Sequence, residues 1–187
     1  AHAESLRARI APPPAASEMT SCPLPAHTRT VAITLIDKDR NACSFINSVF
    51  HNFGSGILAP KSAVNLQNRG EGFVVQPGHP NCVESGKRPL HTIIPAMATR
   101  DGRTVMSFGV MGGEYQAFGH MQFLTRLFDY EMDVQEAMDT PRFFPNPFKD
   151  EVEVEEPIDE EMREKLKALG HNIQLSLIHI SEPTRPI

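Results

Sequence analysis

Two positions in this 187-residue chain carry residue types that suit acyl-transfer chemistry. Thr30 opens a segment of alternating apolar residues directly behind a proline-rich stretch, and Gly112 and Gly113 stand where a strand pattern gives way to a helical one. Cleavage of the bond between Arg29 and Thr30 gives Thr30 a free α-amine, whose pKa of about 8 suits a general base for the adjacent hydroxyl. Backbone N–H groups of the glycine pair, at a helix start, suit an oxyanion. Together these features predict a threonine nucleophile with its own base and oxyanion hole.

A plainer interpretation of both features stays open at this point. A threonine at the head of a strand is ordinarily a β-forming residue, and a Gly-Gly pair is ordinarily a turn. Other chemistries have less support, because the sequence contains no HExxH, GxSxG or P-loop motif, and its 8 histidines fall singly, without metal-ligand spacing. We therefore expect no metal ion and no cofactor.

Composition excludes several classes of partner. Lys and Arg total 18 against 23 Asp and Glu, and the net charge of −5 disfavours nucleic-acid binding. No apolar run approaches the roughly 20 residues of a membrane span. The 3 cysteines lack CxxC spacing, which argues against a disulfide framework or a zinc knuckle. Nothing in the sequence indicates a cellular compartment, and a small-molecule amide substrate is implied only by the family resemblance described below.

The elements that must position Thr30 form a predicted hairpin behind a linker. Residues 1–29 end in a proline-rich stretch that favours an extended chain. Residues 30–36 alternate with period two, so we expect Val31, Ile33 and Leu35 to face a core. A turn over 37–41 leads to a second strand over 42–50, with Cys43 on the core side and Ser44 and Ser48 on the polar face. A turn centred on Asp39 puts Thr30 opposite Ser48.

The rest of the chain predicts a mixture of segregated strands and helices. A loop-rich section over 52–89 is of the kind that lines a site or is disordered. A second hairpin (91–99 and 103–111), helices over 115–131 and 134–138, a proline-rich loop, a strand over 151–155 and a helix over 158–169 follow it. Glu161 and Lys165 are an i,i+4 pair on the last helix, and Gly170 caps it. This order predicts a layered α+β fold rather than a βαβ alternation.

Five stretches carry a resemblance to a known family. They are Thr30 to Ala42, Phe53 to Gly56, Leu66 to Gly70, Gly86 to Pro89 and Gly109 to Gly113. From Thr30 onward the chain resembles the small subunit of the gamma-glutamyltransferase (glutathione hydrolase) family of N-terminal nucleophile hydrolases, and more closely its acylase branch.

That resemblance implies the αββα sandwich of these hydrolases, incomplete in this chain, with the large subunit of the same proenzyme as partner. It implies that Thr30 is the nucleophile exposed by self-cleavage after Arg29, that Ser48 supports it, and that Gly112 and Gly113 form the oxyanion hole. Residues 1–29 are then the end of the large subunit and the processing linker, and residues 30–175 are the partial small-subunit catalytic domain.

Departures from the family pattern bear on the substrate. In the glutathione-cleaving branch an acidic residue holds the substrate amine where Gly72 stands here, and paired serines hold its carboxylate where His91 and Thr92 stand. Arg69 and Glu71 can compensate, or be solvated loop charges. The candidate substrate-binding residues are Asn68, Arg69, Glu71, His91 and Thr92.

The reaction that the resemblance implies is amide hydrolysis or acyl transfer through an acyl-Thr30 ester. The acyl donor is a gamma-glutamyl peptide such as glutathione, or a non-glutamyl amide. A second alternative is a processing-defective family member that acts as a structural or binding subunit. The fragment alone is expected to be inactive. The last residues, 176–187, resemble a translated sequencing-adapter tail, so we expect them to be non-native and exclude them from the fold.

Overall fold

The computed structural model describes residues 30–146 and 149–176. The described chain divides into two compact units, residues 30–140 and residues 141–176, and each is treated by itself. Within the described residues, no helix is both long and apolar enough to cross a membrane. The elements are β1 (Val31–Ile36), β2 (Ala42–Asn47), β3 (Leu58–Ala59), β4 (Val64–Asn65), η1 (Arg69–Gly72), β5 (Ala96–Arg100), β6 (Arg103–Phe108), α2 (Tyr115–Phe128), α3 (Val134–Asp139), β7 (Phe143–Asn146), β8 (Glu151–Val154), α4 (Glu160–Ala168) and β9 (Ile173–Leu175).

The first hairpin has the predicted register. β1 and β2 pair antiparallel from Ile36 opposite Ala42 to Val31 opposite Asn47, so the turn is centred on Asp39 as expected. The Asp37 carboxylate accepts hydrogen bonds from the N–H groups of Asp39 (2.9 Å) and Asn41 (2.8 Å) and closes the turn. The Asn41 side-chain amide also donates to this carboxylate, at 2.8 Å. That bond, and then the backbone bonds from Asn41 and Asp39, lower the pKa of Asp37 because they stabilise its charged form.

The prediction for which face of this hairpin is buried is wrong within the described residues. Val31, Ile33, Leu35 and, opposite Leu35, Cys43 are exposed. The opposite face packs inward, since a Cβ placed on Gly109 would lie 3.3 Å from the Cβ of Ala32. Small side chains on that face allow the close approach, which leaves the large apolar side chains outward.

The second hairpin, β5–β6, lies against the first and is shorter than predicted. The Ser44 hydroxyl donates to the Phe108 carbonyl (2.8 Å) and accepts from the Ala96 N–H (3.2 Å), which joins the hairpins. The predicted strand over 91–99 is wrong for residues 91–95, because the N–H of Ile94 donates to the Gln116 side chain (3.1 Å) instead of to a strand. The predicted strand over 103–111 likewise ends at Phe108.

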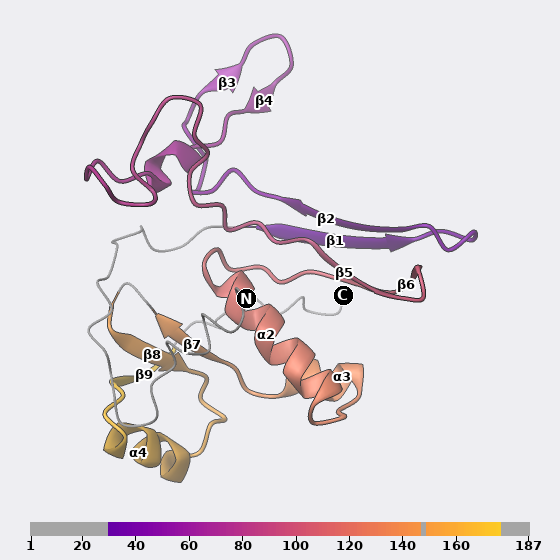
Figure 1. Ribbon diagram of the computed structural model, residues 1–187, viewed down its shortest axis with the longest axis vertical. Helices are drawn as coiled ribbons and strands as arrows, with labels where there is room; N and C mark the ends of the chain where they lie inside the picture. The colour runs from indigo at the N-terminus through magenta and orange to yellow at the C-terminus, as the bar shows by residue number, and fades with distance from the viewer. Residues whose placement is uncertain (1–29, 147–148, 177–187) are drawn as a thin grey trace. The chain divides into compact units, whose positions relative to one another are not determined.

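Helix α2 forms the third layer of this unit (Figure 1). The Phe108 ring lies 5.1 Å from the ring of His120 and 5.9 Å from that of Phe123, centroid to centroid. A Cβ on Gly119 would lie 2.6 Å from Val110 Cγ1, so this contact requires glycine. Hairpin, hairpin and helix make a layered α+β arrangement, as predicted.

Residues 141–176 form a three-stranded sheet of order β7-β8-β9 with α4 beside it. The predicted proline-rich loop is wrong for β7, because Pro145 pairs with Val152 on an edge strand, where a missing N–H is tolerated. Strand β9, parallel to β8, is not anticipated by the sequence. The predicted Glu161–Lys165 pair is confirmed at 2.6 Å.

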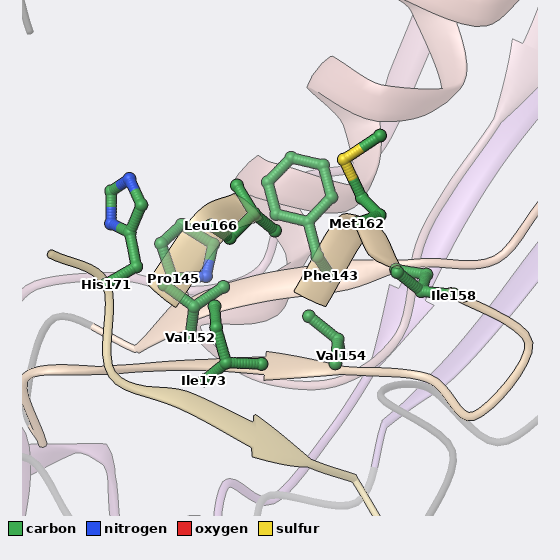
Figure 2. A pocket seen from close by; sticks show the side chains of 9 residues that line it. All are labelled: Phe143, Pro145, Val152, Val154, Ile158, Met162, Leu166, His171 and Ile173. Carbon is green, nitrogen blue, oxygen red and sulfur yellow. The ribbon is translucent and has the colours of Figure 1, made fainter. Parts of the chain in front are cut away.

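Between this sheet and α4 lies an apolar cavity of about 360 Å³ (Figure 2). Its lining is Phe143, Pro145, Val152, Val154, Ile158, Met162, Leu166, His171 and Ile173. None of the predicted site residues lines this cavity, and its walls supply almost no polar group that would orient a substrate. It is a partly open apolar pocket of this unit rather than a candidate catalytic site.

Candidate active site

Thr30 and Ser48 flank the first hairpin at its open end. Thr30 is half-buried and directly precedes β1, and Ser48 directly follows β2. The last pair of the register is Val31 opposite Asn47, so one further step on each strand brings Thr30 opposite Ser48. The Ser48 hydroxyl accepts a hydrogen bond from the Phe50 N–H at 3.0 Å, which fixes its position. Arg29 lies outside the described residues.

Gly112 and Gly113 form the turn that leads into α2. Both have positive φ, 115° and 58°, which glycine adopts without strain. Their carbonyls accept from the N–H groups of Tyr115 (3.0 Å) and Gln116 (3.2 Å), which starts the helix. Within the part of the chain that is described, the N–H groups of the two glycines donate to no protein acceptor. Two free donors at a helix N-terminus suit a developing negative charge.

Contacts between the hairpins show which end of β1 this turn approaches. A Cβ on Gly109 would lie 3.3 Å from Ala32 in β1 and 3.6 Å from Ile46 in β2. Phe108, one residue before Gly109, accepts a hydrogen bond from Ser44, which lies two residues before Ile46 in β2. The end of β6 therefore runs parallel to β2 and antiparallel to β1. Beyond Gly109 the chain leads toward the start of β1, the end that carries the predicted nucleophile, and it reaches the glycine pair three residues later.

Asn68 and Glu71 belong to one hydrogen-bonded cluster. The Asn68 side chain accepts from the His51 N–H at 3.0 Å and donates to Glu71 Oε2 at 2.9 Å. The same carboxylate oxygen lies 3.1 Å from His51 Nδ1. One oxygen of the Glu71 carboxylate is therefore engaged with these neighbours, and the side chain is exposed.

Arg69 lies in a different environment from its neighbour. It is 6% exposed, its Nη1 donates to the Thr92 hydroxyl at 3.3 Å, and its guanidinium carbon lies 5.3 Å from the Phe50 ring centroid. Burial lowers the pKa of Arg69, yet a guanidinium remains charged at neutral pH. Thr92 is also buried, and the hydrogen bond from Arg69 brings these two predicted substrate-binding residues into contact.

Two residues that sequence reasoning missed tie the site together. Phe50 connects Ser48, through its N–H, to Arg69, through its ring. Gln116 is fully buried, and its carbonyl oxygen holds Ile94, two residues beyond Thr92, against the first turn of α2. The sequence signal that could have found Gln116 is a polar residue on the apolar stripe of the predicted helix. Phe50 has no such signal, because it looks like an ordinary strand residue.

His91 is the predicted residue that the structure leaves apart. It is exposed, and its Nδ1 accepts a hydrogen bond from the Ile93 N–H at 3.3 Å. Across residues 30–146 and 149–176, no three His, Cys, Asp or Glu side chains are grouped to hold a metal ion.

Comparison with known proteins decides the family. The family model described as gamma-glutamyltranspeptidase matches residues 1–182. The chain therefore belongs to the gamma-glutamyltranspeptidase family.

Relatives in this family carry several names. The glutathione hydrolase-like YwrD proenzyme of Bacillus subtilis is 35% identical over 169 residues, covering 86% of this chain. The oxamate amidohydrolase proenzyme of Klebsiella pneumoniae is 32% identical over 150 residues, covering 78% of this chain. The crystal structure of cephalosporin acylase from Bacillus halodurans superposes with a TM-score of 0.71 at 38% identity, over 79% of this chain and 27% of that one. The predicted family and layered hydrolase fold are confirmed. The chain spans 32% and 28% of the length of the two curated relatives.

Proposed function

We propose that this chain contributes the nucleophile of an amide hydrolase or acyltransferase that is made as a self-cleaving proenzyme. In this proposal residues 30–175 are the small-subunit catalytic domain, residues 1–29 are the end of the large subunit and the linker, and residues 176–187 are a non-native tail. The observation that carries the proposal is that the hairpin register and the path of β6 bring Thr30, Ser48 and the glycine turn to one end of the unit. The names of both curated relatives include the word proenzyme, in agreement.

The chemistry follows from the groups at that end. After cleavage of the Arg29–Thr30 bond, the Thr30 α-amine accepts the proton of its own hydroxyl while the oxygen attacks the amide carbonyl. The N–H groups of Gly112 and Gly113 bind the resulting oxyanion. Collapse breaks the C–N bond, the α-ammonium returns the proton to the departing amine, and an acyl-Thr30 ester remains. Water, or a second amine, then attacks the ester by the same steps in reverse.

Ser48 and the predicted substrate-binding residues have supporting roles in this proposal. The Ser48 hydroxyl, held by the Phe50 N–H, orients the Thr30 side chain. Of the five predicted substrate-binding residues, the buried Arg69 and Thr92 are the pair proposed to meet the acyl group, whereas Asn68 and Glu71 bond to each other and His91 lies apart. The relatives are named for glutathione, oxamate and cephalosporin, so the acyl group is either gamma-glutamyl or another acid.

The partner in this proposal is the large subunit. The outward face of the first hairpin carries Val31, Ile33, Leu35 and Phe45, with exposures of 56%, 40%, 60% and 51%. Neighbouring apolar side chains on one sheet face mark an interaction surface. A further layer over this face would complete the sandwich that the two hairpins and α2 begin.

Replacement of Thr30 tests the proposal in the full-length proenzyme. Thr30→Ala should leave a single uncleaved chain by intact-mass analysis and no measurable amide turnover, because the hydroxyl that drives both steps is gone. Thr30→Ser keeps a hydroxyl and should retain both activities at a reduced rate. A single chain in the unmodified protein, or turnover that survives Thr30→Ala, would favour the alternative of a structural or binding subunit.

A further inference from the structure

Gly119 lies in the interior of α2, where glycine is an unfavourable residue. A helix loses stability when glycine replaces alanine, because glycine gives up more backbone freedom on folding. Gly119 has the backbone of an ordinary helical residue, without a positive φ, so alanine could adopt the same conformation. The need for glycine at this position therefore comes from the space around it.

Two side chains occupy that space. A Cβ on Gly119 would lie 2.6 Å from Val110 Cγ1 and 2.8 Å from Tyr115 Cε1. Carbon atoms in contact are ordinarily about 3.5–4.0 Å apart, so an added methyl group has to displace one of these neighbours. Neither gives way freely, since valine has a stiff χ1 and Tyr115 is 2% exposed.

Val110 and Tyr115 stand on either side of the glycine turn. Val110 comes two residues before Gly112, and the N–H of Tyr115, the first residue of α2, donates to the Gly112 carbonyl at 3.0 Å. The chain before Val110 is fixed, because a Cβ on Gly109 would lie 3.3 Å from that of Ala32 in the first hairpin. A displacement of Val110 or Tyr115 is therefore transmitted to the turn between them.

We infer that Gly119 is a positioning residue for the proposed oxyanion donors. The missing side chain lets α2 approach the chain that follows β6, and this close approach fixes the direction of the N–H groups of the glycine turn. Those N–H groups donate to no protein acceptor among the described residues, so their direction follows from the backbone of the turn. The inference rests on the proposed function and adds to it a residue that acts through the turn.

Gly119→Ala in the full-length proenzyme tests the role. Intact-mass analysis gives the cleaved fraction, circular dichroism reports folding, and turnover is measured with γ-glutamyl p-nitroanilide and glutaryl p-nitroanilide. We expect kcat per cleaved molecule to fall about 10- to 100-fold, because a misplaced oxyanion donor loses much of its effect. KM should change by less than about 3-fold, because the acyl-Thr30 ester forms and breaks down through an oxyanion and both steps slow together.

A second substitution tests the route through Val110. In Gly119→Ala/Val110→Ala the nearer of the two contacts is removed, so kcat should lie between that of Gly119→Ala and that of Val110→Ala. Gly102→Ala is the matched control, at the opposite end of β6. Gly102 has a φ of 73° and open space around its Cα, so alanine there strains the backbone without reaching the glycine turn, and kcat should keep the parent value.

Several outcomes would overturn the role of Gly119 and leave the threonine mechanism standing. They are an unchanged kcat in folded, cleaved Gly119→Ala, a raised KM at unchanged kcat, and a double variant as slow as Gly119→Ala. Absence of turnover of both anilides by the unmodified, cleaved protein would instead overturn the proposed function itself.

A Gly119→Ala protein that does not fold or cleave moves the comparison to the double variant and Val110→Ala. The added methyl group still lies 2.8 Å from Tyr115 Cε1 in the double variant, so a kcat several-fold below that of Val110→Ala supports the inference. Equal kcat values would mean that glycine serves folding alone, and a double variant that fails as well would mean that Val110 is not the neighbour that matters. Either result overturns the inference.

Discussion

At the scale of single residues, His120 is a titratable group held in an apolar setting. Its ring packs against Phe108 at 5.1 Å, it is 9% exposed, and Nε2 finds no hydrogen-bond partner among the described residues. Burial lowers the pKa of His120 below its ordinary 6.5, because the imidazolium would lose its water without gaining a partner. The neutral ring is therefore the native form.

A pH dependence of stability follows from that lowered pKa. Below pH 6.5 the His120 ring takes up a proton in the unfolded chain but not in the folded chain, so the contribution of His120 to the free energy of unfolding is constant well above pH 6.5 and falls as the pH drops below it. His120→Asn, which does not titrate, should reduce this fall. Urea midpoints of the full-length protein at several pH values measure it, with exposed His171→Asn as control. An equal fall in all three proteins would contradict the prediction.

Residue types alone identify candidate ligand-binding residues but do not separate them from solvated surface charges. Arg69 and Glu71 both stand in one short motif, and either interpretation, ligand-binding or solvated, suits both. The structure separates them, because Glu71 finds Asn68 and His51 whereas Arg69 finds only Thr92 and Phe50. Those partners come from distant segments, and no local pattern in the sequence encodes them.

At the scale of elements, the sequence predicts correctly those turns and helix starts that are fixed by hydrogen bonds between neighbouring residues. The first hairpin closes where Asp37 accepts from the turn amides, and α4 begins where the Asp159 carboxylate accepts from the Met162 N–H at 2.7 Å. Both signals are visible in the sequence. Strand β7 forms because it pairs with β8 at the sheet edge, so its proline content wrongly predicts a loop. Residues 91–95 do not form a strand because Ile94 bonds to the distant Gln116 side chain, so the apparent alternation there is also misleading.

Two glycines of the loop before β3 provide a matched pair for stability. Gly54 and Gly56 both have positive φ, 55° and 71°. A Cβ on Gly54 would lie 2.4 Å from the Leu66 carbonyl oxygen, whereas one on Gly56 meets nothing within 4 Å. Alanine at either position strains the backbone by about 1–2 kcal/mol, but only Gly54→Ala adds a collision with a main-chain atom.

We expect Gly54→Ala to lower the free energy of unfolding by about 1–3 kcal/mol more than Gly56→Ala does. Denaturant midpoints of the two full-length variants, compared with each other rather than with the parent, isolate the collision from the strain. Equal midpoints would mean that the Leu66 carbonyl moves away without cost and would contradict the prediction.

At the scale of the whole molecule, the described unit has one covered and one uncovered sheet face. The inner face of the first hairpin is covered by the second hairpin, through the contact of Gly109 and the hydrogen bond from Ser44 to Phe108. The outer side exposes the apolar residues that the alternation of β1 assigns to a core. The alternation thus identifies a buried face correctly only if a further layer, outside the described residues, covers it. The family membership, with a chain that spans 32% of one curated relative and 28% of another, is consistent with such a layer.

Leu35→Glu tests that layer in the full-length proenzyme. Leu35 is 60% exposed, opposite Cys43 on the outer face, and Val75, 87% exposed in a loop, is the matched control. If the large subunit covers the face, Leu35→Glu buries an unpaired carboxylate at a cost of about 3–5 kcal/mol, lowers the melting temperature and separates the cleaved subunits on size exclusion. Val75→Glu should do neither, because surface substitutions usually change stability by less than about 0.5 kcal/mol. Equal melting temperatures and co-eluting subunits in both variants would mean that the outer face of β1 meets solvent in the complete enzyme, and that the sandwich is closed from another side.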